Sequence, residues 1–517
     1  MQQNPSPKQT GERGKRIDIV HFSKLGHTKA DNPDVIVLTG DVVFRHDSTY
    51  MYCDSAYMYE SVNSLEAFGK VVIEQGDTLF IYGDYLYYDG NKSLAQLREN
   101  VLMENRGLEL YTDNFDYDRI ADIGYFFDGG MLLDSLNELT SVYGQYSPNT
   151  KLAHFYNIVE LTNPNFTLKS DTLIYNTTTK VASILSPTVI EGDSGIIYSS
   201  KGWYDTIEDK AILLNRSVIV SNDKSKTITA DSLAYSRSTG IGEAFGNMEV
   251  NDTIRKVILT GDYGYYDELT DFTFATDGAQ FIEYSQMDSL FLHADTLQMK
   301  TIETEREVKA YHNVRFYRSD LQGVCDSMQY NTIDSLLSLY YYPVVWNDNY
   351  QITGDTIRVY FNQDHIEQVK VLDRAFATEH VDTAYYNQMR GRNIYAYFTE
   401  GELTKIDIEG DTESIYYPLE EGKGYVGQNT TKSSFMTIDV VNRKPVRIYW
   451  YPQSEGNMIP IPDITPENNR LKGFIDYDYL RPKNREDIFI KIERKETDLM
   501  APRRKKKLIL FTATRMQ

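Results

Sequence analysis

A short phrase recurs along this sequence about every 30 residues. It consists of a small residue, an aspartate, an apolar residue two positions on and usually an aromatic residue two further on, as in GDYLYYD at 83–89. The clear copies carry Asp54, Asp84, Asp113, Asp171, Asp231, Asp262, Asp295, Asp326 and Asp355. Neighbouring aspartates are 29 to 33 residues apart, or 58 and 60 where the degenerate copies at 142–146 and 201–204 intervene. A fixed period in this range predicts a stack of repeats in which each unit buries its apolar face only against its neighbours.

Inside each copy the apolar and polar residues alternate with a period of two, which is typical of a strand with one buried face. The pattern places Asp84, Leu86 and Tyr88 on one face. A turn rich in Asn, Asp, Gly and Thr follows most copies, and then comes a second strand phrase with a Gly or Asn bend, as in Ala67-Phe68-Gly69-Lys70. We therefore expect an elongated all-β stack of about twelve repeats without helices. The recurring aspartate is expected at a strand start, where its carboxylate would accept backbone hydrogen bonds from the turn.

Composition excludes several classes of function. The formal net charge of −22 argues against nucleic acid as a partner, because phosphates require a basic surface. It also provides no attraction to anionic membranes. The sequence has no apolar run long enough to span a bilayer as a helix.

Four segments are expected along the chain. Residues 1–16 are expected to be a disordered leader, 17–419 the repeat array, 420–480 an atypical cap at its end, and 481–517 a basic tail that includes the run 503–507. The leader is polar and basic and lacks the apolar core of a signal peptide, so a cytoplasmic protein and a mature exported form both remain open.

The chain shows no arrangement of residues typical of an enzyme. Its eight histidines form no metal-ligand spacing, and it has no nucleophile elbow or phosphate-binding loop. We therefore expect no catalytic residue, no metal and no cofactor. Cys53 and Cys325 lie nine repeats apart, on the order of 40 Å or more, which is too far for a disulfide, so both are expected to be small buried thiols.

The two alternating phrases resemble the repeats of the OstA/LptA-type lipopolysaccharide-transport family, in a version rich in Tyr, Asp and Asn like that of Bacteroidota. The copies at 38–42, 67–71, 83–89, 230–235 and 244–248 carry the resemblance, which extends over roughly residues 30–360. It implies an open, V-shaped β-jelly roll whose apolar groove shelters lipid acyl chains.

The resemblance further implies a non-enzymatic carrier or bridge in the periplasm, with lipopolysaccharide as its ligand, and an association with the outer membrane is left open. Partners would be other Lpt-type proteins that stack edge to edge, one of them at an amino-terminal edge within 17–44, and a homo-oligomer is also left open. Two alternatives remain: a dry β-solenoid scaffold or adhesin that binds protein or glycan, and a β-helical polysaccharide-active enzyme. The residues expected to line the lipid groove are Leu86, Tyr88, Phe115, Tyr117, Leu173, Tyr175, Leu233, Tyr235, Tyr266, Leu297, Met328 and Tyr330.

Overall fold

The structure is a computed structural model that describes residues 16–27, 35–193, 195–302, 305–362, 365–382, 385–420, 422, 424–495 and 498. The predicted leader lies outside the described residues except for Arg16, as does the basic run 503–507. The chain divides into two compact units: unit 1 contains residues 1–254 and 263–269, and unit 2 contains residues 255–262 and 270–517. Each unit is described separately.

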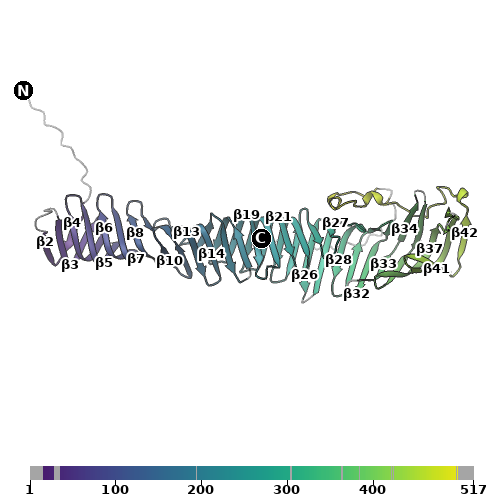
Figure 1. The fold of residues 1–517 in the computed structure, drawn as a ribbon, viewed down its shortest axis with the longest axis horizontal. Helices are drawn as coiled ribbons and strands as arrows, with labels where there is room; N and C mark the ends of the chain where they lie inside the picture. Colours follow the sequence, from purple (N-terminus) through teal and green to yellow (C-terminus); the bar gives the residue numbers. More distant parts are fainter. Residues whose placement is uncertain are drawn as a thin grey trace, which may run out of the picture. The chain divides into compact units, whose positions relative to one another are not determined.

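Unit 1 is an antiparallel ladder in which each long strand pairs along its whole length with the next (Figure 1, purple to teal). Each long strand is bent near its middle, so its two halves belong to two facing layers. Layer A1 contains the strand halves that meet at the turns after His46, Gln75 and Asn105, and layer B1 contains those that meet at the turns after Tyr59 and Asp89. In places a layer is built from short separate strands, as where β9 and β10 both pair with β8.

The strands of unit 1 are β1 Asp18–His21, β2 Lys24–His27, β3 Val35–His46, β4 Thr49–Tyr59, β5 Ser64–Gln75, β6 Leu79–Asp89, β7 Leu94–Asn105, β8 Leu108–Asp118, β9 Ile123–Phe126, β10 Gly130–Asp134, β11 Asn137–Ser141, β12 Tyr143–Ser147, β13 Leu152–Asn163, β14 Phe166–Asn176, β15 Val181–Ile184, β16 Thr188–Gly192, β17 Gly195–Ser199, β18 Lys201–Asp205, β19 Lys210–Ser221, β20 Lys226–Ser236 and β21 Ile241–Asp252. Strand β22, Val257–Asp267, contributes residues to both units.

Unit 2 repeats the same plan. Its layer A2 contains the strand halves that meet at the turns after Arg318 and Asn347, and its layer B2 those that meet at the turns after Asn331 and Thr399. The strands are β23 Phe272–Thr276, β24 Gln280–Glu283, β25 Leu290–His293, β26 Thr296–Ile302, β27 Glu305–Arg318, β28 Leu321–Asn331, β29 Leu336–Tyr340, β30 Val344–Asn347, β31 Tyr350–Thr353, β32 Thr356–Asn362, β33 His365–Leu372, β34 Ala375–Asp382, β35 Tyr385–Gly391, β36 Asn393–Thr399, β37 Glu402–Tyr416, β38 Leu419–Glu420, β39 Gly424–Tyr425, β40 Gln428–Val441, β41 Lys444–Tyr451 and β42 Glu455–Ile459.

The described residues contain no α-helix, only the 3-10 turns η1 Ile461–Asp463, η2 Asp478–Leu480 and η3 Asp487–Phe489. The prediction of an all-β chain is therefore confirmed, and its paired strands are antiparallel. Paired strands also continue past residue 419, through β40, β41 and β42.

The glycine or asparagine of the second strand phrase lies at the bend of its strand. At the bend one strand carries two residues in the left-handed region, as at Gly69 and Lys70 (φ 73° and 46°) or Glu99 and Asn100 (φ 64° and 51°), and the pairing register shifts there. An extra residue of this kind kinks and twists a strand. The predicted bends are thus creases that divide each strand between two layers.

The recurring aspartate has a different place from the one predicted. Asp84 lies in mid-strand at the crease and is exposed, whereas Leu86 and Tyr88 are buried, so the three do not share a face. Its carboxylate accepts a hydrogen bond from the side-chain amide of Asn100 (2.6 Å), and Asn247 and Asn313 make equivalent bonds to Asp231 and Asp295 (2.7 and 2.6 Å). The turn is stabilised instead by the last aspartate of the phrase, as Asp89 accepts the backbone N–H groups of Asn91 and Lys92 (3.0 and 3.1 Å).

The amino-terminal edge of unit 1 is formed by β1 and β2, which pair with the two halves of β3. Strand β3 is therefore internal, since β4 pairs with its other side. Both edge strands are short, and Val20, Phe22 and Leu25 are exposed.

Candidate functional site

Inward-facing side chains form two parallel rows along each unit. In layer B1 the deep row, nearer the crease, includes Leu86, Phe115 and Leu173, and the outer row, nearer the turns, includes Tyr88, Tyr117 and Tyr175. All six are predicted groove residues, and all six are 0% exposed. The interior of unit 1 is closed at these positions.

The outer row of unit 1 is sealed by hydrogen bonds between the turns of the two layers. Tyr88 from layer B1 meets His46 Nδ1 at the end of a layer A1 strand (2.6 Å), and Arg119 donates to the Tyr88 hydroxyl and to the His46 carbonyl (2.6 and 3.2 Å). Further along, Tyr146 and Lys151 donate to the Asn105 side chain (both 3.2 Å). These side chains close the side of unit 1 at which the turns of the layers face each other.

A second group of buried hydrogen bonds surrounds Tyr175. Its hydroxyl donates to Asp134 (2.9 Å) and accepts from Asn137 (2.9 Å), and Lys180 pairs with Asp134. Burial, and then the charge of Asp134, raise the pKa of Tyr175, so the phenol is neutral and acts as a donor. Burial also raises the pKa of Tyr88, although the Arg119 guanidinium opposes this.

The predicted groove residues at the end of unit 1 are less enclosed. Leu233 is buried, Tyr235 is half-buried and Tyr266 is 36% exposed. The Tyr235 hydroxyl donates to Glu268 (3.2 Å), and burial together with the Glu268 charge raises the pKa of Tyr235 to about 12.

Unit 2 carries the same two rows in layer B2, but its outer row is half-exposed. The deep row contains Leu297, Ala310, Met328, Leu339, Ile357, Val371, Ile394, Ile408 and Met436, and except for half-buried Met328 these side chains are buried. The outer row contains Met299, Val308, Tyr330, Leu337, Val359, Val369, Ala396 and Ile406, all half-buried, and ends at Ile438, which is buried. Unit 2 therefore presents a partly open apolar strip along its interior.

Side-chain size explains the difference between the two units. The outer row of unit 1 contains Tyr88, Tyr117, Tyr146 and Tyr175, whose hydroxyls reach polar partners. In unit 2 most of these positions carry aliphatic side chains, which are shorter and have no hydrogen-bonding group. Tyr330 is an exception, and its ring packs edge-on against Phe361 (6.2 Å between centroids).

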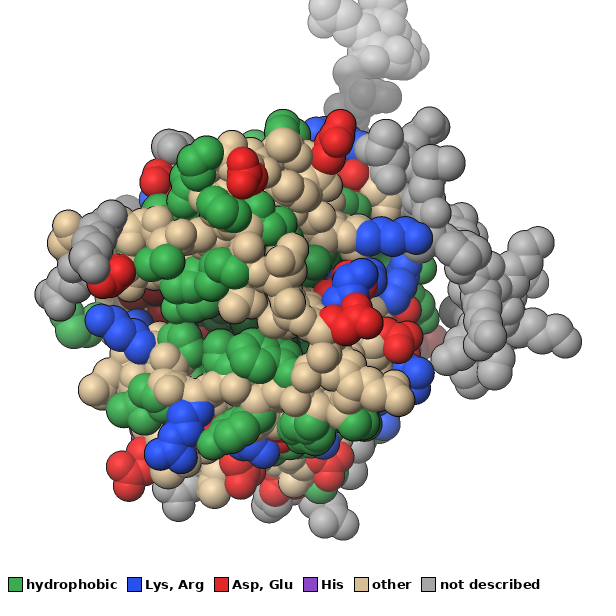
Figure 2. Space-filling model, turned by 90° about the vertical axis from the view of Figure 1, so that its right-hand side faces the viewer, with side chains coloured by type: hydrophobic (Ala, Val, Ile, Leu, Met, Phe, Trp, Pro, Cys, Tyr) green, Lys and Arg blue, Asp and Glu red, His purple; other side chains and the backbone are tan. Residues whose placement is uncertain are grey.

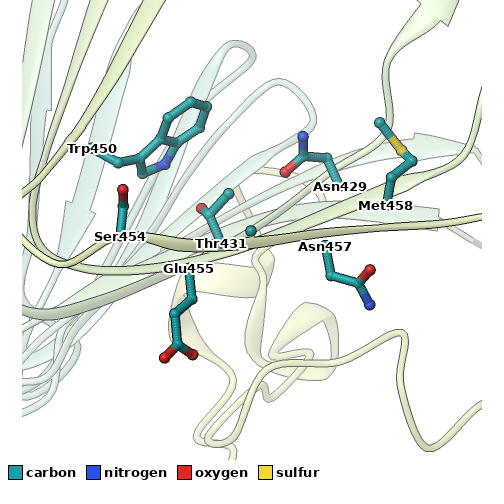
Figure 3. A pocket seen from close by; sticks show the side chains of 8 residues that line it. Asn429, Thr431, Trp450, Ser454, Glu455, Asn457 and Met458 are labelled. Atoms are coloured by element: carbon teal, nitrogen blue, oxygen red, sulfur yellow. The ribbon is translucent and has the colours of Figure 1, made fainter.

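The interior of unit 2 ends in a pocket of about 320 Å³ at the last strands. Trp450 of β41 lies opposite Met436 and so extends the deep row, while Asn429 and Thr431 of β40 and Met458 of β42 line the pocket from layer A2 (Figure 3). The Trp450 indole Nε1 is buried and has no hydrogen-bond partner among the described residues. Figure 2 looks onto this end and shows hydrophobic side chains on both sides of a hollow. The pocket was not predicted, because it depends on strands from both layers meeting at the end of the unit.

The described residues offer no obvious place for metal chemistry or thiol chemistry. No three His, Cys, Asp or Glu side chains gather closely enough within them to hold a metal ion. Cys53 and Cys325 are free and buried, as predicted, and burial raises the pKa of the Cys53 thiol to about 12.

In the described part of the chain, no helix has the length and apolar character needed to cross a membrane.

Comparison with known proteins agrees with the repeat pattern. Residues 14–171 match the family model described as OstA-like protein. The sequence matches no curated protein. A similar solved structure is LptH from Pseudomonas aeruginosa, described as the LptA-homologous periplasmic component of the conserved lipopolysaccharide transport device. The two are 11% identical over 20% of this chain and 79% of LptH, with a TM-score of 0.19, which is too low to establish a shared fold. The family match is therefore confined to residues 14–171, which are similar to OstA-like proteins.

Proposed function

We propose that this protein is a non-enzymatic periplasmic carrier that holds the acyl chains of lipopolysaccharide along the interior of unit 2. The observation that carries the proposal is the outer row of layer B2, which is apolar and half-exposed, whereas the corresponding row of unit 1 is buried and sealed from Tyr88 to Tyr175. The choice of lipopolysaccharide rests on the resemblance of the repeats to those of the lipopolysaccharide-transport family.

The energetics favour acyl chains over the headgroup as the source of affinity. Each methylene removed from water contributes about 0.8 kcal/mol. The protein and lipopolysaccharide are both anionic, so charge opposes their association. A lipid would therefore bind through its chains along the outer row and keep its phosphates outside, and the pocket at Trp450 would be the place where chains enter or leave.

Unit 1 has a different role in this proposal. Its predicted groove residues Leu86, Tyr88, Phe115, Tyr117, Leu173 and Tyr175 have no exposed surface for a ligand. Unit 1 would be a dry scaffold that presents β1 and β2 as an edge for strand pairing with a similar β-domain of a transport partner or of a second copy.

Site-specific photo-crosslinking tests the lipid proposal. A photoreactive aromatic residue at Val359, in the outer row, should capture lipopolysaccharide in cells, and one at Tyr360, on the opposite face of the same strand, should not. A third at Tyr88, in the sealed interior of unit 1, should also remain unlabelled. Equal labelling at 359 and 360, or none at 359 with purified lipid in excess, would contradict the proposal.

A charge substitution provides the matched binding experiment. Val359→Asp should weaken lipid binding at least tenfold, because it places a carboxylate against acyl chains. Tyr360→Asp should leave binding unchanged. Both variants are first compared with the natural protein by thermal unfolding, so that a loss of binding is not confused with a loss of fold.

A further inference from the structure

The carboxy-terminal segment of unit 2 returns along the outer face of layer A2, the face that points away from the interior (Figure 1, yellow). We call residues 465–490 the strap. It crosses the strands of layer A2 in the reverse of chain order, contacting β35 at Asn469, β31 at Ile475 and β28 at Arg481.

Glutamines on alternate strands of layer A2 hold the strap. Gln322, Gln351 and Gln388 lie in one row of cross-strand partners, with Trp346 and Thr378 between them. Their side chains are 2%, 8% and 1% exposed. Buried amides of this kind are costly unless each is hydrogen-bonded.

Two of these glutamines bind the strap as a neighbouring strand would. Gln351 Oε1 accepts the N–H of Tyr477 and its Nε2 donates to the carbonyl of Ile475 (both 2.9 Å). Gln388 Oε1 accepts the N–H of Leu471 (2.9 Å) and its Nε2 donates to the carbonyl of Asn469 (2.8 Å). Because a glutamine amide has the same donor and acceptor groups as a peptide bond, it recognises main chain whatever the side chain.

Strap residues six positions apart in the chain contact glutamines that lie two strands apart in layer A2. The bonded positions advance from Asn469 to Ile475 and from Leu471 to Tyr477, while the glutamines advance by two strands, about 9.6 Å. Arg481 then donates to Gln322 Oε1 (2.7 Å). Buried Arg315 donates to the carbonyls of Leu480 and Asp487 (3.1 and 3.2 Å).

Apolar side chains of the strap add anchors with the same step. Phe474 packs edge-on against Phe376 and Tyr386, with centroids 6.3 and 5.2 Å apart. Six residues later, Leu480 joins a buried cluster with Val324, Val344 and Trp346. Side-chain anchors combined with main-chain hydrogen bonds are typical of surfaces that recognise a peptide segment.

We infer that the outer face of layer A2 is a polypeptide-binding site, and that the strap is its built-in ligand, held by its own contacts and not merely by its covalent connection. The site accepts a segment with main-chain groups in six-residue register and apolar anchors six residues apart. An empty site would expose the apolar side chains of Val324, Val344 and Trp346 to water, so the face favours an occupant.

Cleavage of the connection tests the inference on the full-length protein. A recognition sequence for a specific protease is inserted after exposed Pro460, and the cut protein is passed over a size-exclusion column at micromolar concentration. The strap fragment should elute with the array. Elution of the fragment as a free peptide would overturn the inference.

Glutamine variants distinguish specific recognition of the strap from nonspecific association. Gln351→Leu and Gln388→Leu should each raise the dissociation constant of the cut strap about tenfold, because each leaves one strap N–H and one carbonyl without a partner. Gln145→Leu, on β12 of unit 1, is the matched control and should have no effect. If the uncut variants fold and their straps bind as tightly as that of the natural protein, the glutamine row is not the recognition element. The lipid crosslink at Val359 is independent of this outcome.

Discussion

At the scale of single residues, tyrosine hydroxyls account for the difference between the sealed outer row of unit 1 and the half-exposed outer row of unit 2. Tyr175 is the clearest case, because its hydroxyl connects layer B1 to Asp134 and Asn137 of layer A1. Leucine at this position would fill the interior but could not satisfy those polar groups. In unit 1, the outer residue of the repeated phrase is therefore a tyrosine whose hydroxyl makes hydrogen bonds to the facing layer.

Removal of this hydroxyl should weaken unit 1. Tyr175→Phe is expected to lower the free energy of unfolding by about 1–3 kcal/mol, because Asn137 and Asp134 each lose a buried partner. Urea denaturation followed by circular dichroism measures the change. Tyr143→Phe is the control, since that side chain is 46% exposed, and its effect should remain within about 0.5 kcal/mol. Equal effects of the two substitutions would show that the seal adds no stability.

The tyrosines also predict how stability depends on pH. Burial, with Glu268, Glu243 and Glu379 respectively, raises the pKa values of Tyr235, Tyr263 and Tyr350 from 10.0 to about 12. The folded state thus holds these protons more tightly than the unfolded state. Their contribution to stability should be complete below pH 10 and should be lost as the pH rises from 10 to about 12. The difference in tyrosinate absorbance between the natural protein and a variant with these three tyrosines changed to phenylalanine reports on these phenols alone. Their ionisation at pH 10, with the circular dichroism of the folded state retained, would contradict the prediction.

At the scale of elements, the crease is the unit that repeats. It combines a left-handed pair on one strand with the exposed aspartate of a neighbouring strand, as in Glu99–Asn100 and Asp84. The repeated phrase predicts that this aspartate recurs, but neither its place in mid-strand nor its partner, because the asparagine that binds it is 16 residues away in the chain.

Two substitutions of Asn100 should separate the roles of its backbone and its side chain. Asn100→Gly keeps the left-handed conformation and loses only the bond to Asp84, so it should cost about 1 kcal/mol of unfolding free energy. Asn100→Ala loses the bond and also strains the backbone at φ 51°, so it should cost about 1–2 kcal/mol more. Urea midpoints of the two variants give the comparison, and equal midpoints would mean that the crease imposes no strain.

Alternation also had limits as a predictor of burial. It correctly predicts the buried rows at Leu86 and Tyr88, since period-two patterning follows from strand geometry. It wrongly places Asp84 on the same face, because the crease shifts the register within the phrase. The edge expected within 17–44 lies at β1 and β2, while β3 in the same range is internal.

At the scale of the whole molecule, the net charge of −22 shapes any encounter with an anionic lipid. If acyl chains supply the affinity, raising the salt concentration from about 0.05 M to about 0.5 M should strengthen binding of lipopolysaccharide, because it screens the repulsion. A lipid with similar chains and a neutral headgroup is the control and should bind with little dependence on salt. Weaker lipopolysaccharide binding at high salt would point to a cationic site and against the proposed mode.

The sequence by itself determined the strand class, the repeat, the position of the turns and which apolar residues of the phrase face inward, because each of these follows from local periodicity. Only the tertiary structure decided whether an inward residue is sealed or open. Tyr88 and Tyr330 occupy the same place in the phrase, yet one meets His46 of the facing layer and the other is half-buried. The same holds for the strap, whose residues read as a cap and a basic tail until Gln351 and Gln388 are seen beneath them. Both outcomes depend on which side chains face each other across layers, and such partners lie about 40 to more than 120 residues apart in the chain, as for Tyr88 with His46 and for Gln351 with Ile475.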